Sequence, residues 1–474
     1  MGQEINRTTF GPPDFARFSA RLESETRLLR EHIKGKQHAD DAFVAGFELE
    51  AWLLDRHGLP FPINEDYLAR LNNPLVVPEL SKFNVELNST PQPLRAGALR
   101  RLENELSATW DQCLRTAHDI EGTIVAIGTL PTIRERDLCL ANMSPLNRYY
   151  ALNDQVLSSR GGRPLRINIA GNEQLALEHN DVMLEAAATS FQVHLQAPAD
   201  QIVRYYNASA ILSAPLVAAS ANSPFLFGRD LWDETRIPLF EQSVDTGVPY
   251  EDRRHRVRFG RGYLEASPME YFDESVREFP VLLPMTYTDN PETLPHLQLH
   301  NGTIWRWNRL LLSFDEQHQP RLRIEQRVMP AGPTIIDMIA NAALYIGATH
   351  GLARLPRAPE SALDYMQARH NFYAAARHGL SAQLAWLNGR QIDARTLLLE
   401  EIIPLARDGL AALGIAADEI GRYLNLMTAR VRSGQNGATW QRVHAKRHDR
   451  DFKKLVADYL AHQRSAVPVH EWSI

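Results

Sequence analysis

The chain has 474 residues, of which 44% are hydrophobic and 23% are charged, so it is long enough for one large core or two domains. Its formal net charge of -6 argues against a nucleic-acid-binding protein that relies on a basic surface. Cys113 and Cys139 are too few for a disulfide framework and fit a reducing compartment. The start of the chain shows no signal peptide, and no apolar run of about 18 residues indicates a membrane span. We therefore expect a cytoplasmic protein.

Residues 44–54 predict an apolar strand with two carboxylates set into its middle. Side chains of a strand alternate between its two faces, so Gly46, Glu48 and Glu50 share one face while the apolar residues between them share the other. Two carboxylates held side by side repel each other unless a cation or a basic group lies between them. Hard divalent cations with oxygen ligands commonly fill that role. A solvated strand face is the alternative for these two glutamates taken alone.

Three later strands repeat this construction of one apolar face and one polar face. They are predicted at 82–90, 189–196 and 321–328, and their polar faces carry Asn84, Glu86 and Asn88, then Gln192 and His194, then Arg323, Glu325 and Arg327. For His194, a structural hydrogen bond and a ligand contact are both open. Arginine is a natural partner of phosphate oxygens, although arginine beside glutamate also fits a plain ion-pair ladder. Glu79 precedes the first of these strands, where the chain is predicted to turn.

Helical spacing of apolar residues predicts helices at 14–33, 94–118, 202–219 and 334–348, and a pattern that is helical throughout from 358 to 463 with breaks near Gly389, Gly414 and Gly437. The segment 158–163 is predicted to be a mobile loop that could cover a ligand. The most basic run, 253–262, is interpreted as a solvated loop in preference to an anion site. Cys113 lies on the apolar stripe of its helix, which favours a core thiol over a nucleophile.

An antiparallel sheet with one uncovered face accommodates these elements. We predict an α+β fold in which a curled antiparallel sheet of about six strands forms an open-faced active-site cleft, with helices packed on its other face and a helical C-terminal region. The catalytic part is expected at 1–350, and the helical region packed on it at 351–474. The cleft would combine carboxylates with cationic side chains, the mixture that a metal-phosphate site needs. The sequence lacks both the glycine-rich phosphate loop and the dinucleotide fingerprint.

The polar strand faces belong to a longer ordered series of short motifs: Gly46, Glu48 and Glu50; Glu86–Ser89 with Pro91; Arg148 with Tyr149; Gln192–His194; Ala221–Phe225; Thr303–Trp305 with Arg309; and Glu325–Arg327 followed by Pro333 and Thr334. With this series the chain resembles the glutamate-cysteine ligases of the second type and the related carboxylate-amine ligases, which share a glutamine synthetase-like catalytic sheet. Each motif alone is weak, whereas the ordered set over residues 40–350 is fairly specific.

The resemblance implies an ATP-dependent ligase that uses two or three Mg²⁺ ions. In such ligases the γ-carboxylate of glutamate attacks the terminal phosphate of ATP, and an amine, here first of all that of cysteine, captures the acyl phosphate. Carried over by position, the resemblance assigns Glu48, Glu50, Glu86 and Glu325 to metal; His194, Gln192 and Arg323 to the nucleotide; Arg327 and Arg309 to the transferred phosphoryl group and a further anion contact; and Arg148, Tyr149 and Asn88 to substrate. Phosphoryl transfer mainly requires the protein to position the reactants and to neutralise charge, and these residue types can do both.

The sequence departs from the family at 294–309, where Trp305 to Trp307 place bulky groups at positions expected to hold a proline and an acidic residue. This departure leaves the acceptor amine open, and another amine or amino acid is the first alternative to cysteine. A catalytically silent relative that keeps the fold, and a metal-dependent hydrolase, are alternatives from other classes. The expected partners are small molecules, with no nucleic acid and no membrane, and the sequence does not predict the oligomeric state.

Overall fold

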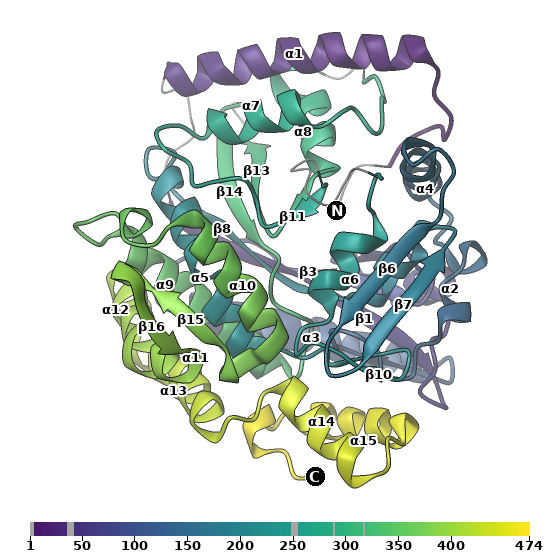
Figure 1. Ribbon diagram of the computed structural model, residues 1–474, viewed down its shortest axis with the longest axis vertical. Helices are drawn as coiled ribbons and strands as arrows, with labels where there is room; N and C mark the ends of the chain where they lie inside the picture. The colour runs from purple at the N-terminus through teal and green to yellow at the C-terminus, as the bar shows by residue number, and fades with distance from the viewer. Residues whose placement is uncertain (1–3, 36–41, 248–254, 288–289, 316–317) are drawn as a thin grey trace.

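The computed structural model describes residues 4–35, 42–247, 255–287, 290–315 and 318–474. An antiparallel sheet with the strand order β13-β14-β8-β1-β3-β2 runs through its centre, and β4 and β5 pair with opposite ends of β1 (Figure 1). Its strands are β1 Val44–Asp55, β2 Val76–Pro78, β3 Asn84–Asn88, β4 Gln92–Pro93, β5 Gly122–Val125, β8 Phe191–Gln196, β13 Asn308–Phe314 and β14 Pro320–Gln326. The predicted α+β fold with a curled antiparallel sheet of about six strands is confirmed.

Helices surround this sheet, and short two-stranded pieces complete the fold. The α-helices are α1 Pro12–Lys34, α2 Asn64–Leu71, α3 Ala98–His118, α4 Asn147–Ser159, α5 Ile202–Ser220, α6 Arg236–Ser243, α7 Met269–Glu278, α8 Pro295–Gly302, α9 Ile335–Ala353, α10 Tyr365–His378, α11 Ala394–Leu397, α12 Ile403–Ala412, α13 Ala417–Ser433, α14 Gly437–Arg447 and α15 Phe452–Ser465. The strand pairs are β6 Leu165–Ala170 with β7 Gln174–His179, β9 Phe225–Leu226 with β10 Arg229–Asp230, β11 Val257–Arg258 with β12 Trp305–Arg306, and β15 Gln383–Trp386 with β16 Arg390–Asp393.

The two faces of β1 follow from its sequence. The odd-numbered side chains from Ala45 to Leu53 are buried in the main hydrophobic core, whereas Glu48 and Glu50 lie on the opposite face. This is the alternation of a strand with one covered face. The helices α5 and α9 pack against each other and against the neighbouring strands β8 and β14, so the apolar face of the sheet is covered by helices as predicted.

The helix α9 is long and apolar enough to cross a membrane, but 83% of its apolar window is buried inside the protein. Its composition is therefore explained by its place in the core. Thr334 accepts a hydrogen bond from the backbone N–H of Asp337 and so caps the helix, as the sequence predicts.

The predicted helical pattern after residue 358 is wrong at the hairpin β15–β16, whose turn lies at the predicted break near Gly389. Leu384 and Trp386 alternate with less buried neighbours, and the turn between the strands holds Asn388 at a φ of 61° and Gly389 at 75°. Asn-Gly is a strong hairpin-turn signal, because both residues tolerate positive φ. The side chain of Asn371 in α10 accepts a hydrogen bond from the backbone N–H of Ala385 at 2.8 Å, which ties the hairpin to that helix.

Two other predictions are corrected. The segment 158–163 begins inside α4, and Arg160 is buried and ion-paired with Asp245 at 2.5 Å, so this part of the chain is fixed and not a mobile cover.

In the basic run, Arg253 and Arg254 lie outside the described residues. Arg256 and Arg258 are buried; Arg256 donates to the backbone oxygen of Thr303 at 3.0 Å and Arg258 pairs with Glu274. The prediction of a solvated loop is wrong for these two arginines, because their charges are used in packing.

The C-terminal helices are joined to the catalytic sheet by a polar contact at Asn222. Its side-chain amide donates to the backbone oxygen of Ala331 and to the hydroxyl of Tyr459 in α15, both at 2.8 Å, and its oxygen accepts from Gln441 in α14 at 2.8 Å. A Cβ at Gly437 would lie 2.0 Å from that oxygen, so only glycine permits this approach. The segment that begins at Gly437 therefore packs onto the core.

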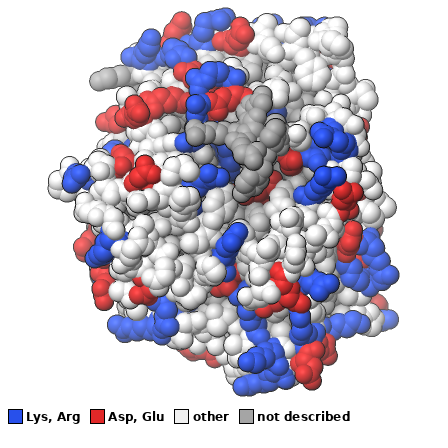
Figure 2. Space-filling view, in the orientation of Figure 1, with Lys and Arg blue, Asp and Glu red and all other residues white. Residues whose placement is uncertain are grey.

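Charged side chains of both signs are interspersed over the face of the molecule shown in Figure 2. Lys and Arg gather along its lower edge, where α14 and α15 lie in Figure 1.

A buried ion pair connects α13 to α9, and its loss should destabilise the protein. Arg430, which is 1% exposed, pairs with Asp337 at 2.7 Å and also donates to the backbone oxygen of the same residue at 3.1 Å. We expect Arg430→Met to lower the free energy of unfolding by about 3–5 kcal/mol, because it leaves a buried carboxylate without its partner. Denaturant unfolding followed by circular dichroism measures this. Arg432→Met, on the exposed side of the same helix, is the control, and equal losses for both variants would contradict the prediction.

Candidate active site

The strand register brings the predicted polar residues to one place on the uncovered face of the sheet. Glu48 of β1 lies opposite Gln192 of β8, and Glu50 lies opposite Glu86 of β3. On the other side of β8, His194 lies opposite Glu325 of β14. Arg309 of β13 in turn lies opposite Glu325. Residues that are far apart in the chain therefore become cross-strand neighbours.

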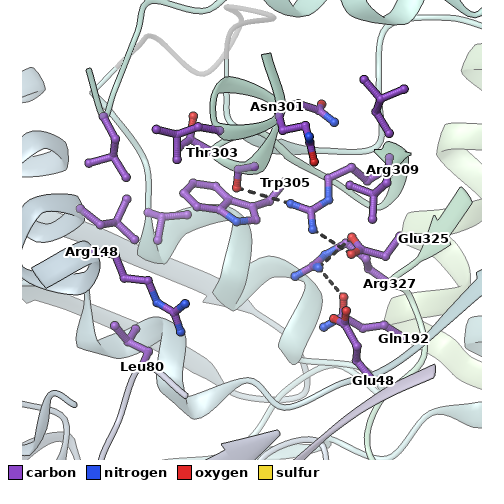
Figure 3. Close-up of a pocket in the computed structure, with 18 of the residues that line it drawn as sticks. Glu48, Leu80, Arg148, Gln192, Asn301, Thr303, Trp305, Arg309, Glu325 and Arg327 are labelled. Carbon is purple, nitrogen blue, oxygen red and sulfur yellow. Dashed lines mark hydrogen bonds and ion pairs between the residues drawn. The ribbon is translucent and has the colours of Figure 1, made fainter. Parts of the chain in front are cut away.

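Glu48, Glu50, Gln192, Arg309 and Glu325 line a cavity of about 390 Å³, and Glu86 and His194 lie beside its lining residues on the same strands. Its charged lining residues are Glu48, Glu50, Glu79, Glu185, Glu325, Arg148, Arg309, Arg323 and Arg327. In Figure 3, Arg309, Glu325, Arg327, Gln192 and Glu48 form one continuous group, Arg148 reaches in from the opposite side, and Trp305 lies between them. Apolar residues complete the wall: Leu80, Leu152, Phe240, Val244, Leu283, Leu299, Leu311 and Leu312.

One end of the site balances carboxylates against cationic side chains. Glu325 accepts from Arg309 at 2.8 Å and from Arg327 at 2.9 Å. Burial alone would raise the pKa of Glu325, but the two guanidinium groups hold it well below its usual range. His194 lies 3.2 Å from Glu48 through Nε2, and its Nδ1 accepts from Arg323 at 3.1 Å. Burial likewise opposes ionisation of Glu48, yet His194 lowers its pKa to about 2.

The other end gathers carboxylates without enough positive charge. Single carboxylate oxygens of Glu50, Glu79 and Glu86 lie within 4.8 Å of one another. Burial raises the pKa of all three, and the like charges of neighbours raise the pKa of Glu79 and Glu86 further, that of Glu86 to about 7. Glu79 Oε1 is buried and has no hydrogen-bond partner in the described part of the chain. A divalent cation with oxygen ligands fits this donor set, since it would neutralise the repulsion and use the free oxygen.

A second group, Glu48, His194 and Glu325, also offers ligand atoms within 4.8 Å of one another. Its carboxylates already have cationic partners, so its need for a metal ion is smaller than that of the first group. The four glutamates predicted from the sequence to bind metal are thus divided between two places on the sheet, two in each.

The remaining predicted residues have different surroundings. Arg148 and Tyr149 come from the start of α4, where Arg148 donates to the Tyr149 hydroxyl at 2.9 Å and its guanidinium lies 4.7 Å from the centre of that ring. Gln192 donates to Glu50 at 2.9 Å and accepts from Arg327, so it links the two ends of the site. Asn88 donates to Glu86 at 3.0 Å and is not part of the cavity wall.

Two glutamates of the site were missed as site residues at the sequence level. Glu79 was noted only as lying in a turn; it follows β2, whose pairing with β3 places it beside Glu86, and that pairing is not visible in the sequence. Glu185 lies in the short helix η3, Val182–Ala187, within an apolar stretch that gives no sign of a site. Burial, together with the charge of Glu50, raises the pKa of Glu185 to about 8.

The bulky residues at 305–307 have separate roles. Trp305 borders the cavity, whereas Trp307 is fully buried outside it and donates its indole N–H to Glu241 at 2.9 Å. Arg306 is also buried and pairs with Glu274 at 2.8 Å. Of the three, only Trp305 shapes the space for a ligand.

A curled antiparallel sheet whose open face carries clustered carboxylates, a histidine and several arginines is the arrangement expected of an ATP-dependent ligase. The model of glutamate-cysteine ligase family 2 matches residues 44–458, and the chain belongs to that family. It is an ATP-dependent carboxylate-amine ligase, as the resemblance implied.

Solved structures agree in fold. The glutamate-cysteine ligase of Francisella tularensis, in complex with AMP, superposes with a TM-score of 0.51 at 13% identity, covering 92% of this chain and 96% of that one. A bifunctional glutathione synthetase from Pasteurella multocida gives a TM-score of 0.52 at 11% identity, covering 92% of this chain and 55% of that one. No curated protein sequence gives a significant match.

The carboxylate cluster predicts an unusual dependence of stability on pH. Folding raises the pKa of the fully buried Glu86 from 4.5 to about 7, so between these values the folded chain binds more protons than the unfolded chain. Stability contributed by this group is therefore fully present below pH 4.5 and is lost as the pH rises through 7. A tenfold change in proton affinity corresponds to about 1.4 kcal/mol, so the loss in metal-free protein is on the order of 3 kcal/mol.

Thermal unfolding at pH 5 and pH 8, in EDTA and in Mg²⁺, measures this effect. We expect the midpoint in EDTA to fall toward pH 8 and Mg²⁺ to restore it. Glu86→Gln should flatten the pH dependence in EDTA, and an unchanged slope in that variant would contradict the prediction.

Proposed function

We propose that the protein joins the γ-carboxylate of glutamate to the amine of cysteine at the expense of ATP. The uncovered face of the sheet is divided into a carboxylate cluster and an arginine-rich group, and this division supports the proposal most directly. The carboxylates suit metal binding, and the arginines suit contact with phosphate oxygens. Phosphoryl transfer needs compensation of the charge on phosphate oxygens, and arginines supply it. A carboxylate is a poor acyl donor until it is phosphorylated.

Each group of site residues would contact a different part of the substrates. Arg327 and Arg309 would contact phosphoryl oxygens, and both are held in place by Glu325. His194, Gln192 and Arg323 would contact the nucleotide, and Arg148 and Tyr149, on the opposite wall, would contact the amino-acid substrate. Asn88 would act through Glu86, which its amide holds.

Two or three Mg²⁺ ions are proposed to bind, at Glu50 and Glu86 together with Glu79, and at Glu48 and Glu325. When bound, these ions neutralise the phosphate charge and align the γ-phosphate with the attacking carboxylate. The protein supplies rigid strands that hold the ligand atoms in register, and a cavity that limits access of water to the reactive acyl phosphate.

A second candidate keeps the same chemistry with a different amine. Trp305 borders the cavity in the region where the sequence departs from the family, and several leucines lie in the same wall, so the acceptor space is bounded by large apolar groups. An apolar pocket separates acceptors by only about 1–3 kcal/mol for each methylene, so related amines would compete with cysteine.

We also propose a domain division, a class of partner and a compartment for the protein. The catalytic part is placed at 1–350 and the helical region at 351–474, the partners are small molecules, and the compartment is the cytoplasm. The charged residues that line the cavity support small-molecule partners.

The first test is release of ADP from ATP by the purified protein with Mg²⁺ and glutamate, with and without cysteine. We expect cysteine to accelerate ADP release and mass analysis to detect γ-glutamylcysteine. Turnover that needs glutamate but ignores cysteine would favour the second candidate and call for a panel of amines. No turnover with any acid would contradict the ligase assignment for this chain.

The second test concerns Glu79, which offers a carboxylate oxygen within 4.8 Å of those of the proposed ligands Glu50 and Glu86. Glu79→Gln removes one anionic oxygen ligand while keeping the side-chain shape. We expect the Mg²⁺ concentration for half-maximal activity to rise by about 10- to 100-fold, since loss of a supporting group costs metal sites that much. Glu65→Gln, an exposed residue of α2, is the control. An unchanged Mg²⁺ requirement in Glu79→Gln would exclude Glu79 as a ligand.

A further inference from the structure

One wall of the cavity is the short helix α8, and its N-terminus has no cap of its own. The residue at the N-cap position is Leu294, an apolar side chain that accepts no hydrogen bond from the free N–H groups of the first turn. Glu25 of α1 takes this role, because its Oε2 accepts from the backbone N–H of Leu297 at 2.9 Å. A carboxylate is also favoured at a helix N-terminus by the helix dipole. The helix α8 therefore receives its cap from α1.

The other oxygen of the same carboxylate holds His296. Oε1 of Glu25 lies 2.5 Å from Nδ1 of His296, and the backbone N–H of Tyr287 donates to Nε2 of that ring at 3.2 Å. A ring nitrogen that accepts a hydrogen bond carries no proton, so the proton of the neutral ring is on Nδ1, which donates to Glu25. Glu25 is 4% exposed and His296 is 2% exposed. One buried pair thus joins α1, α8 and the chain that leads to Tyr287.

Two of these three segments carry residues of the cavity wall. The helix α8 contributes Pro295, Gln298, Leu299, Asn301 and Gly302, and the chain before it contributes Leu283 and Tyr287. At the end of α8, Asn301 donates to a backbone oxygen of β13 at 2.9 Å, and Arg309 donates to the backbone oxygen of Gly302 at 3.4 Å. Figure 3 shows Asn301 beside Arg309. The surroundings of Arg309, which is proposed to contact the phosphoryl group, therefore depend on the position of α8.

The helix α1 acts on the site only from outside. Within the described part of the chain it contributes no side chain to the cavity lining, and it precedes residues 44–458, which match the family model. It packs over α7 and α8 as an outer layer (Figure 1), where Arg30 pairs with Asp273 of α7 at 2.6 Å. The path from α1 to the cavity wall thus runs through the contacts of Glu25.

We propose that Glu25 and His296 are positioning residues that keep α8 and the chain before it closed over the cavity, and so keep water from the acyl phosphate. This inference rests on the proposed function, which forms that intermediate. In the reaction that the closed wall prevents, water attacks the acyl carbon and loses a proton to solvent, and the bond from that carbon to the phosphate oxygen breaks. Glutamate and inorganic phosphate are then formed beside ADP, and ATP is consumed without formation of an amide.

Glu25→Gln tests the role of the carboxylate. Its amide keeps the shape but has only one oxygen, so it cannot accept from both His296 and Leu297. The measured quantity is the ratio of ADP released to amide product formed, with Mg²⁺, glutamate and the acceptor that wild type uses. We expect this ratio, and the release of ADP with glutamate but no acceptor, to rise by about 10-fold, the scale of losing one hydrogen bond to a charged group. A smaller fraction of folded enzyme would lower ADP and product together and leave their ratio unchanged.

Three further variants make the result specific. His296→Leu loses both hydrogen bonds of the ring and should raise the ratio as Glu25→Gln does. His296→Asn keeps an N–H donor near the position of Nδ1 and should restore part of the coupling. Glu23→Gln, at an exposed position of α1, removes a glutamate charge from the same helix and should leave the ratio unchanged. The two His296 variants carry the same test if Glu25→Gln does not fold.

Hydrogen exchange of the backbone amides of α8 gives a measurement that needs no turnover. We expect exchange in α8 to be faster in Glu25→Gln than in wild type and Glu23→Gln, because the helix loses its cap. Unchanged exchange in α8 would overturn the positioning role.

The outcomes separate this inference from the proposed function. Absence of glutamate-dependent ADP release by wild type with every acceptor would contradict the proposed function, and the inference with it. If wild type forms the amide, an unchanged ratio in Glu25→Gln and His296→Leu would overturn the positioning role alone. An equal rise in Glu23→Gln would also overturn it, since the effect would then not depend on the contact with α8.

Discussion

Repulsion among buried carboxylates is the constraint on which the site depends. Single carboxylate oxygens of Glu50, Glu79 and Glu86 lie within 4.8 Å of one another; Glu50 and Glu86 are on paired strands, and Glu79 directly follows the paired strand β2, so the sheet holds them together. In a low-dielectric interior such repulsion is far stronger than in water. The sheet stores this unfavourable interaction because helices cover its other face and the core beneath β1 is closely packed. A cation with oxygen ligands would make the same arrangement of carboxylates favourable, because it would neutralise their repulsion.

The electrostatic environment differs between the two ends of the sheet face: carboxylate pKa values are lowered at one end and raised at the other. Around Glu325 the guanidinium groups of Arg309 and Arg327 keep the carboxylate ionised and are in turn held by it. Around Glu86, burial and the charges of neighbouring carboxylates raise the pKa values. Gln192 forms hydrogen bonds with Glu50 of one group and with Arg327 of the other, so it connects the two groups. Perturbed pKa values of opposite sign in one cleft are typical of an active site.

The C-terminal helices are structurally part of the catalytic fold. The family match extends to residue 458, inside α15, and the contacts at Asn222 and Arg430 connect α13, α14 and α15 to the segments that carry the site. Asn222 follows α5 and bonds to the backbone just before α9, the two helices that support the sheet. A polar contact of this kind fixes one docking position, since a shift would leave buried amide groups unpaired.

The sequence by itself determined the alternating strands and their polar faces. Of the twelve residues that it assigned to a site, all but Asn88 border the cavity or belong to a candidate metal group: Glu48, Glu50, Glu86, Arg148, Tyr149, Gln192, His194, Arg309, Arg323, Glu325 and Arg327. Side-chain alternation, a local property of a strand, indicated the polar strand faces, whereas Arg148, Tyr149 and Arg309 followed from the family resemblance. Only the tertiary structure decided how the glutamates divide between two clusters, added Glu79 and Glu185, and buried Arg256 and Arg258. These features depend on strand order, on register and on which helix covers which side chain, and all three are set by contacts between residues far apart in the chain.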